Sequence, residues 1–225
     1  MRPSLLALAL TFSCRNAPID DGATFGRFTQ VKTFFTSVFV AETTEGVLLV
    51  DAGFSKAARP IESHLESRDL TLSDVTDILL THGHTDHVRG LGSFPNARIW
   101  AHEDEVDHIV AEAPEGTEVT DTVVDGDRIW FGDLEVAFYH VPGHTSGNLT
   151  LLADDVLVLG DSAMSFKDGT VGPAPERYSD HPGRAEAELL ALRDRLLDQN
   201  TSLTAVVFAH SEGLLDPTPF WDMNP

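Results

Sequence analysis

Short apolar blocks separated by polar turns run through most of this chain. In its first half we predict β-strands within Phe28–Val40, Val47–Val50, Val75–Leu80 and Ala97–Ala101. Blocks of this length, rich in Val, Ile, Leu and Phe and bounded by turn residues, are typical of buried strands. Strands are therefore expected to form the centre of the first half.

The second half repeats this pattern without repeating the sequence. We predict strands within Arg128–Tyr139, on either side of a turn at Phe131–Asp133. Asn148–Ala153 and Val156–Leu159 are expected to pair as a hairpin, because the two residues between them are both Asp. Leu203–Phe208 is predicted to be a closing strand.

Helical spacing of apolar residues occurs between the strand blocks. We predict helices over Lys56–Ser67, Val88–Leu91, Glu103–Glu112 and Arg184–Leu197. The last of these has one apolar side, formed by Leu189, Leu192, Leu196 and Leu197. The C-terminal stretch Asp216–Pro225 is Pro-rich and is predicted to be irregular. Strand groups separated by helices indicate an α/β fold whose sheets are covered on their outer faces by helices.

Length and charge limit the classes of protein to consider. With 225 residues the chain fits one domain with a sizeable core. Its 36 acidic and 15 basic side chains give a formal charge of −21, which repels nucleic acid and anionic lipid. We therefore expect no nucleic-acid partner. No apolar run reaches the roughly 18 residues that a membrane span needs, so no transmembrane segment is expected.

The first 22 residues are predicted to be a leader and linker, followed by the domain at residues 23–225. A short basic start precedes the apolar run Leu5–Phe12, which is typical of a secretory signal. Ser13 and Cys14 resemble a lipoprotein cleavage point, at which Cys14 would carry a lipid anchor. The alternative is an exposed leader or a first β-strand with Cys14 buried. Export as a lipoprotein and residence in the cytoplasm are therefore equally open.

The segment Thr81–His87, with the sequence THGHTDH, directly follows a predicted strand and carries the candidate chemistry. In extended backbone, residues two apart point to the same side, so His82 and His84 can hold one ion. A helix beginning at Val88 would direct Asp86 and His87 toward a second position. Neutral imidazole and carboxylate are ligands that zinc accepts. The alternative, a solvated polar loop, is disfavoured because three of the ten histidines fall within these few residues.

Three later residues complete a candidate ligand set. His144 follows Val141-Pro142-Gly143, Asp161 follows Leu159-Gly160, and His210 follows the apolar run 205–208. Each lies where an apolar strand stops and a Gly or small residue permits close approach. Strand ends are where α/β folds collect functional groups on loops.

Taken together, these motifs resemble the metallo-β-lactamase superfamily. The similarity rests on the HxHxDH run, the PGH of 142–144, the GD of 160–161, the late His210 and the LVDAG of 49–53. It spans about residues 28–213 and implies an αββα sandwich, with two mixed β-sheets flanked by helices. It also implies a first metal held by His82, His84 and His144, and a second held by Asp86, His87 and His210. Asp161 would bridge the two ions, and Asp51 would hydrogen-bond a ligand histidine.

The resemblance implies a metallo-hydrolase with two Zn²⁺ ions, with iron or manganese as alternatives. A bridging hydroxide would attack an ester, thioester, lactone or related small substrate. Asp86 is the candidate catalytic residue, which would orient the water and pass a proton to the leaving group. Two other enzymes stay open: a mononuclear iron persulfide dioxygenase, and a metal-dependent nuclease of the same fold, which the acidic charge disfavours. A non-enzymatic metal-binding domain is disfavoured because no ligand is missing.

Residues at a few individual positions indicate which branch of the superfamily the chain resembles most. Asp161 distinguishes the chain from true β-lactamases and makes it more similar to glyoxalase II, acyl-homoserine lactonases and ribonuclease Z. Met164 stands where lactonases carry Tyr, and Phe208–Gly213 differs from the PGHG of relatives. Gly90–Ala97 is similar to metallo-β-lactamase domain-containing protein 1. The other histidines without a recognisable partner, His64, His108, His140 and His181, are interpreted as structural or surface residues. The sequence leaves the substrate, the native metal and the oligomeric state open.

Overall fold

Strand β4 (Gly46–Val50) shows how the apolar blocks become layers. Successive side chains of a strand point to opposite faces of a sheet. Leu48 and Val50 accordingly join the core between the two sheets, whereas Val47 and Leu49 join the core beneath the helices. Both faces of this strand are therefore covered. The computed structural model describes residues 15–224.

The first sheet is mixed and has seven strands in chain order. Neighbouring strands from β1 to β4 are antiparallel, and those from β4 to β7 are parallel. Its strands are β1 (Thr24–Phe25), β2 (Phe28–Thr33), β3 (Thr36–Thr43), β4, β5 (Val75–Leu79), β6 (Arg98–His102) and β7 (Asp121–Val123).

The second sheet is also mixed and has the order β14-β11-β10-β9-β8. Only its pair β11 and β14 is parallel. Its strands are β8 (Arg128–Phe131), β9 (Leu134–His140), β10 (Leu149–Ala153), β11 (Val156–Val158) and β14 (Ala205–Val207). A separate small sheet pairs β12 (Ala163–Ser165) with β13 (Val171–Pro173).

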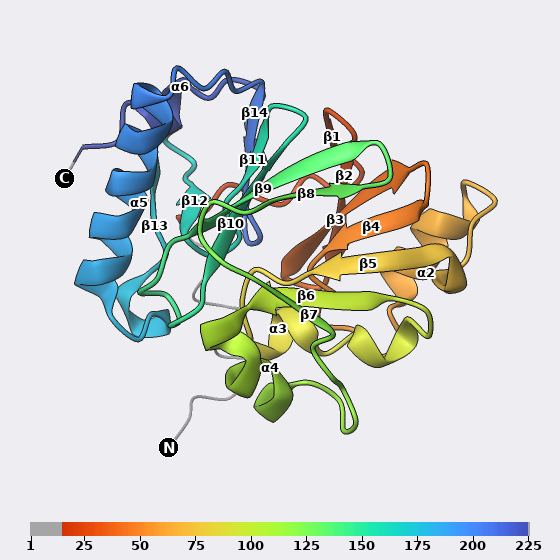
Figure 1. Ribbon diagram of the computed structural model, residues 1–225. Helices are drawn as coiled ribbons and strands as arrows, with labels where there is room; N and C mark the ends of the chain where they lie inside the picture. The colour runs from red at the N-terminus through yellow and green to blue at the C-terminus, as the bar shows by residue number, and fades with distance from the viewer. Residues whose placement is uncertain (1–14, 225) are drawn as a thin grey trace.

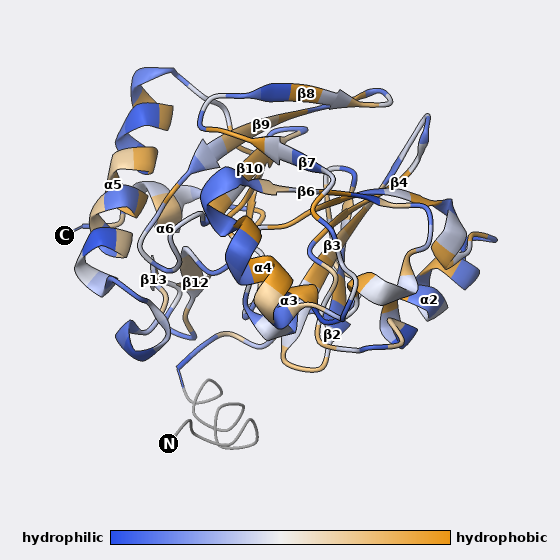
Figure 2. Cartoon of the chain, turned by 60° about the horizontal axis from the view of Figure 1, so that its bottom comes forward, coloured by the Kyte–Doolittle hydropathy of each residue, from blue (hydrophilic) through white to orange (hydrophobic). Residues whose placement is uncertain are grey.

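Helices cover the outer face of each sheet (Figure 1). Over the first sheet lie α2 (Arg59–Glu66), α3 (Thr85–Val88) and α4 (Val106–Glu112), and over the second lie α5 (Pro182–Asp198) and α6 (Thr218–Trp221). Short 3₁₀ turns occur at Leu72–Asp74, Leu91–Ser93, Glu103–Glu105 and Glu176–Tyr178. Figure 2 shows α5 banded with hydrophobic and hydrophilic residues, as expected for a helix with one buried side. The four layers form the predicted αββα sandwich of two mixed sheets.

Three apolar cores separate these layers. The central core fills the space between the sheets and includes Phe39 and Phe138. A second core packs the first sheet against its helices, with Ile61 of α2 fully buried. A third packs the second sheet against α5 and α6, with Phe220 fully buried. Burial of apolar surface on both faces holds each sheet in place.

Several strands end at a common edge of the sandwich. Parallel strands β4 and β5 place the residues that follow them, Asp51 and Thr81, next to each other. In the second sheet, the parallel strands β11 and β14 end just before Asp161 and His210. The fold therefore brings loops that are distant in the chain to one place.

The structure corrects several predicted elements. The block Phe28–Val40 is a hairpin whose turn contains Phe34, which has a positive φ of 77°. The helix predicted from Val88 begins at Thr85, so Asp86 and His87 lie on it. The predicted irregular C-terminal stretch contains α6, because Phe220 has a place in the third core. Strands of two or three residues, such as β1 and β12, carry too little periodicity to be predicted.

Residues 15–22, predicted to be part of a linker, lie against the domain. Asn16 pairs with Phe166, and the backbone N–H of Ala17 donates to the carbonyl of Ser165 at 3.1 Å. Cys14 and the predicted leader lie outside the described residues, so the lipid anchor and the division at residue 23 stay predictions. Within residues 15–224, no helix has the length and hydropathy of a membrane span.

Helix α5 offers a matched test of the third core. Leu196 is fully buried, but Leu197, which was predicted to share its side, is 50% exposed because successive helical residues are 100° apart. We predict that Leu196→Ala lowers the free energy of unfolding by about 2–5 kcal/mol. Leu197→Ala should lower it by about 1 kcal/mol or less. Urea denaturation of both variants measures the difference, and equal losses would contradict the packing described.

Candidate metal centre

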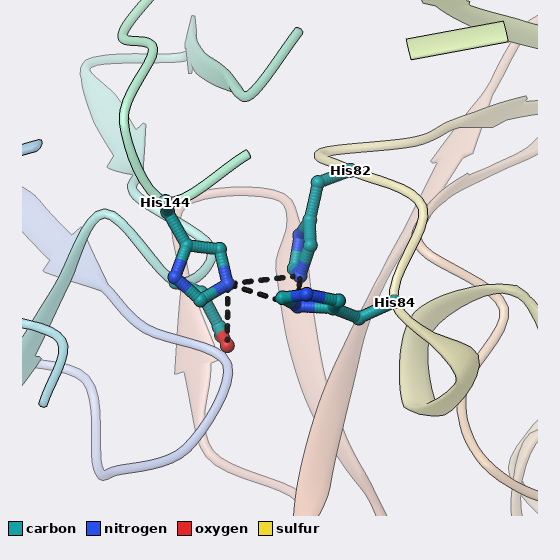
Figure 3. A group of neighbouring side chains, drawn as sticks. His82, His84 and His144 are labelled. Carbon is teal, nitrogen blue, oxygen red and sulfur yellow. Dashed lines mark hydrogen bonds and ion pairs between the residues drawn. The ribbon is translucent and has the colours of Figure 1, made fainter. Parts of the chain in front are cut away.

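Three imidazoles meet at the end of β5 and the loop after β9 (Figure 3). His144 Nε2 lies 3.0 Å from His84 Nδ1 and 3.3 Å from His82 Nε2, and the latter two nitrogens are 2.9 Å apart. The rings are nearly perpendicular to one another, which lets the three nitrogens approach one another without the rings stacking. His82 and His144 are buried, and His84 is partly exposed. We call these three residues the first triad.

A second triad lies beside the first and consists of Asp86, His87 and His210. His210 Nε2 is 3.2 Å from Asp86 Oδ2, and His87 Nε2 is 3.5 Å from the same oxygen. Asp161 connects the triads. Its Oδ2 is 3.2 Å from His210 Nε2 and 3.5 Å from His144 Nε2, and its Oδ1 is 3.6 Å from His87 Nε2.

These separations fit metal ligation. Ligand atoms bound tetrahedrally to zinc at about 2.0–2.1 Å lie roughly 3.3 Å from one another. The separations within and between the triads, from 2.9 to 3.6 Å, are close to this value. Among the described residues, the buried His87 Nε2 and Asp161 Oδ1 also have no hydrogen-bond partner. Since a buried polar atom without a hydrogen bond is costly, both atoms fit a cation held at the second triad.

Asp51 organises the second triad from behind. Its Oδ2 is 2.7 Å from His87 Nδ1, and its Oδ1 accepts from the backbone N–H of Thr81 at 2.8 Å. Asp51 has a positive φ of 64°, a conformation that Asp tolerates better than most residues. The bond to Nδ1 leaves His87 Nε2 to face Asp86 and Asp161. The predicted hydrogen bond between Asp51 and a candidate ligand histidine is therefore present.

Backbone groups and hydroxyls orient three of the other imidazoles. His210 Nδ1 donates to the carbonyl of Phe35 at 2.8 Å, and His144 Nδ1 is 3.2 Å from Ser179 Oγ. His82 Nδ1 is 3.0 Å from Thr81 Oγ1. Each of these contacts turns the opposite ring nitrogen toward the shared centre, as hydrogen-bond partners of ligand histidines do.

The first triad is neutral at pH 7. Burial lowers the pKa of His144 to about 4, with a further contribution from the nearby imidazoles. Burial and the neighbouring His87 hold the pKa of His82 well below its usual value, and burial also lowers the pKa of His84. Neutral imidazole is the form that binds metals.

The second triad is charged in the absence of a metal. Burial alone would lower the pKa of His87, but Asp51, Asp86 and Asp161 outweigh it and raise this pKa to about 9. Asp161 and Asp86 likewise raise the pKa of His210 well above its usual value, despite its burial. Protons therefore supply here the positive charge that a metal ion would supply.

A cavity of about 490 Å³ adjoins the first triad. Its lining is polar and consists of His84, Thr85, His108, Glu112, Ser146 and Asp180. His108, interpreted from sequence as structural or surface, lies here and is 2.8 Å from Glu105 through Nδ1. The i,i+3 spacing of Glu105 and His108 on a predicted helix was the one available signal. Asp180 and Ser146 lie on loops, where the sequence carried no signal.

His140, also interpreted as structural or surface, stacks on His102 with ring centroids 3.8 Å apart and an interplanar angle of 16°. Stacked rings lie in separate, nearly parallel planes, so their in-plane lone pairs cannot both point at one ion. These two histidines therefore do not form a third site in this arrangement, although Asp104 lies nearby. The seven candidate ligands predicted from sequence all lie in the two triads and their connecting Asp161.

The family model described as the metallo-beta-lactamase superfamily matches residues 31–210. The chain belongs to the metallo-beta-lactamase superfamily. The matched range begins in β2 and ends at His210, so it includes all seven candidate ligands and Asp51.

Curated proteins match parts of the chain. A hydroxyacylglutathione hydrolase of Aeromonas hydrophila subsp. hydrophila is 36% identical over 122 residues, which cover 52% of this chain and 42% of that protein. The exodeoxyribonuclease YycJ of Bacillus anthracis is 34% identical over 108 residues, which cover 44% of this chain and 38% of that protein. The chain thus spans less than half the length of these relatives.

Solved structures of superfamily members share the fold. The di-zinc class B3 metallo-beta-lactamase LRA-12 from an Alaskan soil metagenome superposes with a TM-score of 0.65 at 19% identity, covering 86% of this chain and 79% of that one. The subclass B3 metallo-beta-lactamase BJP-1 of Bradyrhizobium japonicum superposes with a TM-score of 0.63 at 20% identity. This superposition covers 87% of this chain and 79% of that one. At such identities the similarity establishes the fold alone.

The charge difference between the triads can be measured in this superfamily member. We predict that metal-free protein at pH 7 has doubly protonated His87 and His210, whereas the first-triad imidazoles are neutral. Because a metal must displace the protons of the second triad, the affinity for the second ion should rise as the pH rises toward 9. Imidazole ¹⁵N chemical shifts report each protonation state. Five imidazoles that all titrate near their ordinary pKa would contradict the assignment.

Proposed function

We propose that this protein is a dinuclear metal-dependent hydrolase that acts on an ester, thioester, lactone or related small carbonyl compound. The observation that carries the proposal is the pair of ligand triads joined by Asp161, which contacts His144 on one side and His87 and His210 on the other. One carboxylate shared between two triads is the arrangement expected for two adjacent cations rather than one.

In this proposal the first triad would hold one divalent ion, the second triad would hold the other, and Asp161 would be available to both. Such a pair supplies Lewis acidity, which makes water nucleophilic at neutral pH and polarises a substrate carbonyl. His/Asp donors suit zinc, and iron or manganese would also be accepted. The mostly buried ligands exclude bulk water from one side of the centre, so that the reaction takes place at the cavity beside His84.

Asp86 is the residue to which we assign proton transfer. Its contacts with His87 and His210, the other members of the second triad, both use Oδ2. Its Oδ1 can then accept a proton from the attacking water and return it to the leaving sulfur or oxygen as the carbonyl carbon–heteroatom bond breaks. Asp86 lies at the start of α3 and is partly exposed, which gives it access to substrate.

The relatives and the residues that line the cavity limit the classes of substrate to consider. Similarity to hydroxyacylglutathione hydrolases supports thioesters as the first class to test. Glu112 and Asp180 line the cavity, and no Lys or Arg is among its lining residues. Carboxylates here would repel an anionic leaving group such as glutathione. A neutral or cationic leaving group therefore fits this cavity better.

A metal-dependent nuclease is the second candidate, because an exodeoxyribonuclease is among the relatives. The formal charge of −21 and the acidic cavity disfavour a polyanionic substrate. The persulfide dioxygenase alternative needs a single iron ion. The triads and Asp161, with ligand atoms for two ions, support the hydrolase instead.

The function is tested on purified protein by metal analysis followed by hydrolysis assays. We expect two zinc ions per chain and hydrolysis of neutral thioesters faster than of glutathione thioesters or phosphodiesters. His84→Ala should reduce bound metal and lower kcat/KM by at least about 100-fold, because a ligand of the first triad is lost. Circular dichroism should show an unchanged fold, since His84 lies at the rim of the cavity.

His64→Ala provides the control, because this histidine lies on α2, away from both triads. It should retain metal and activity. One iron per chain with persulfide oxidation would favour the dioxygenase, and preferential phosphodiester cleavage would favour the nuclease. Undiminished hydrolysis by metal-free protein would rule out the proposal.

A further inference from the structure

Glu105 is a buried carboxylate between the two loops that carry the first triad. Its residue exposure is 1%, and it lies at the junction between the 3₁₀ turn Glu103–Glu105 and α4. An ionised carboxylate is rarely buried without partners, because burial removes its hydration. The partners of this one are therefore informative.

Each oxygen of Glu105 accepts from a different ligand loop, and Oε1 also lies 2.8 Å from His108 Nδ1 on α4. Oε1 accepts from the backbone N–H of Gly83 at 2.9 Å, between His82 and His84. Oε2 accepts from the backbone N–H of Gly147 at 2.7 Å and from Thr145 Oγ1 at 2.9 Å, in the loop that begins with His144. The two loops are about sixty residues apart in the chain, and this side chain connects them.

Two glycines make this contact sterically accessible. A Cβ at Gly147 would lie 2.6 Å from the backbone nitrogen of Glu105, and a Cβ at Gly83 would lie 2.9 Å from His108 Cγ and Ile109 N. Real Cβ atoms do not approach so closely. Both glycines therefore let their loops pack directly on the segment that presents Glu105, independently of the hydrogen bonds themselves.

We propose that Glu105 is a positioning residue that sets the separation between His144 and the His82–His84 pair. The inference rests on the proposed metal pair, since it assigns Glu105 a role in the first triad. Glu105 does not touch substrate or metal. It acts through the backbone of both loops, so that three imidazole nitrogens are held close together before any ion binds. Such preorganisation strengthens metal binding because fewer loop conformations are lost on binding.

A carboxylate is required because its two oxygens accept from donors on opposite sides. In Glu105→Gln one oxygen becomes an amide NH₂, which is a donor and cannot accept from a backbone N–H. One ligand loop would then lose its anchor, while side-chain volume hardly changes. Loss of a hydrogen-bond partner behind metal ligands typically reduces metal affinity by about 10–100-fold.

The test is metal affinity of full-length Glu105→Gln, measured by competition with a chelator and by the visible spectrum of the cobalt-substituted protein. We expect the ion of the first triad to bind about 10–100-fold more weakly and its d–d bands to change. The ion of the second triad should be unaffected. Thr145→Val removes a single hydrogen bond to Oε2 and should give a smaller loss. It serves as the second variant if Glu105→Gln does not fold.

Asp77→Asn is the matched control. Asp77 is also buried, at 2%, and it bonds Trp100 Nε1 and Arg98 rather than a ligand loop. It should lower the melting temperature with both metal affinities unchanged. Normal metal affinities and cobalt spectra for Glu105→Gln or Thr145→Val would overturn the positioning role while the proposed function stands. A parent protein that binds no metal would instead refute the proposed function.

Discussion

The site depends on one constraint, which is that its buried ligand groups lack enough hydrogen-bond partners among the described residues. Five imidazoles and two carboxylates meet at the edge of the sandwich, and His87 Nε2 and Asp161 Oδ1 have no hydrogen-bond partner within the described residues. Burying such groups is unfavourable unless a charge or a hydrogen bond compensates. Without metal, the raised pKa of His87 provides part of this compensation through bound protons. With metal, cations would provide it, so the same constraint couples folding, proton binding and ligation.

The sandwich makes this concentration of polar groups tolerable. Three apolar cores hold the two sheets and their helices together, and the polar groups are confined to loops beyond the strand ends. Hydrogen bonds from behind, such as Asp51 to His87 and Phe35 to His210, determine which ring nitrogen faces inward. Glu105 adds a connection between loops that the sheets alone would leave independent. Rigid strands and a few buried carboxylates together keep the triads in place.

Sequence reasoning predicted the layers and the meeting of the triads, because both have strong local signals. Strands such as β4 are short continuous apolar runs bounded by turn residues, and the cluster from His82 to His87 follows a strand directly. It did not predict α6, whose packing depends on a core made by distant residues. It also missed Glu105, since hydrogen bonding to remote loops leaves little trace in spacing, and His108, for which the i,i+3 spacing from Glu105 was a weak signal. The turn at Phe34 was missed because a positive φ at Phe has no pattern in the sequence.

The central claim is that the two triads hold a pair of cations. Crystals of the protein soaked in zinc, with diffraction recorded on both sides of the zinc absorption edge, test it most directly. We predict two anomalous peaks, one among His82, His84 and His144 and the other among Asp86, His87 and His210, with Asp161 between them. A single peak at this edge of the sandwich, or none, would contradict it.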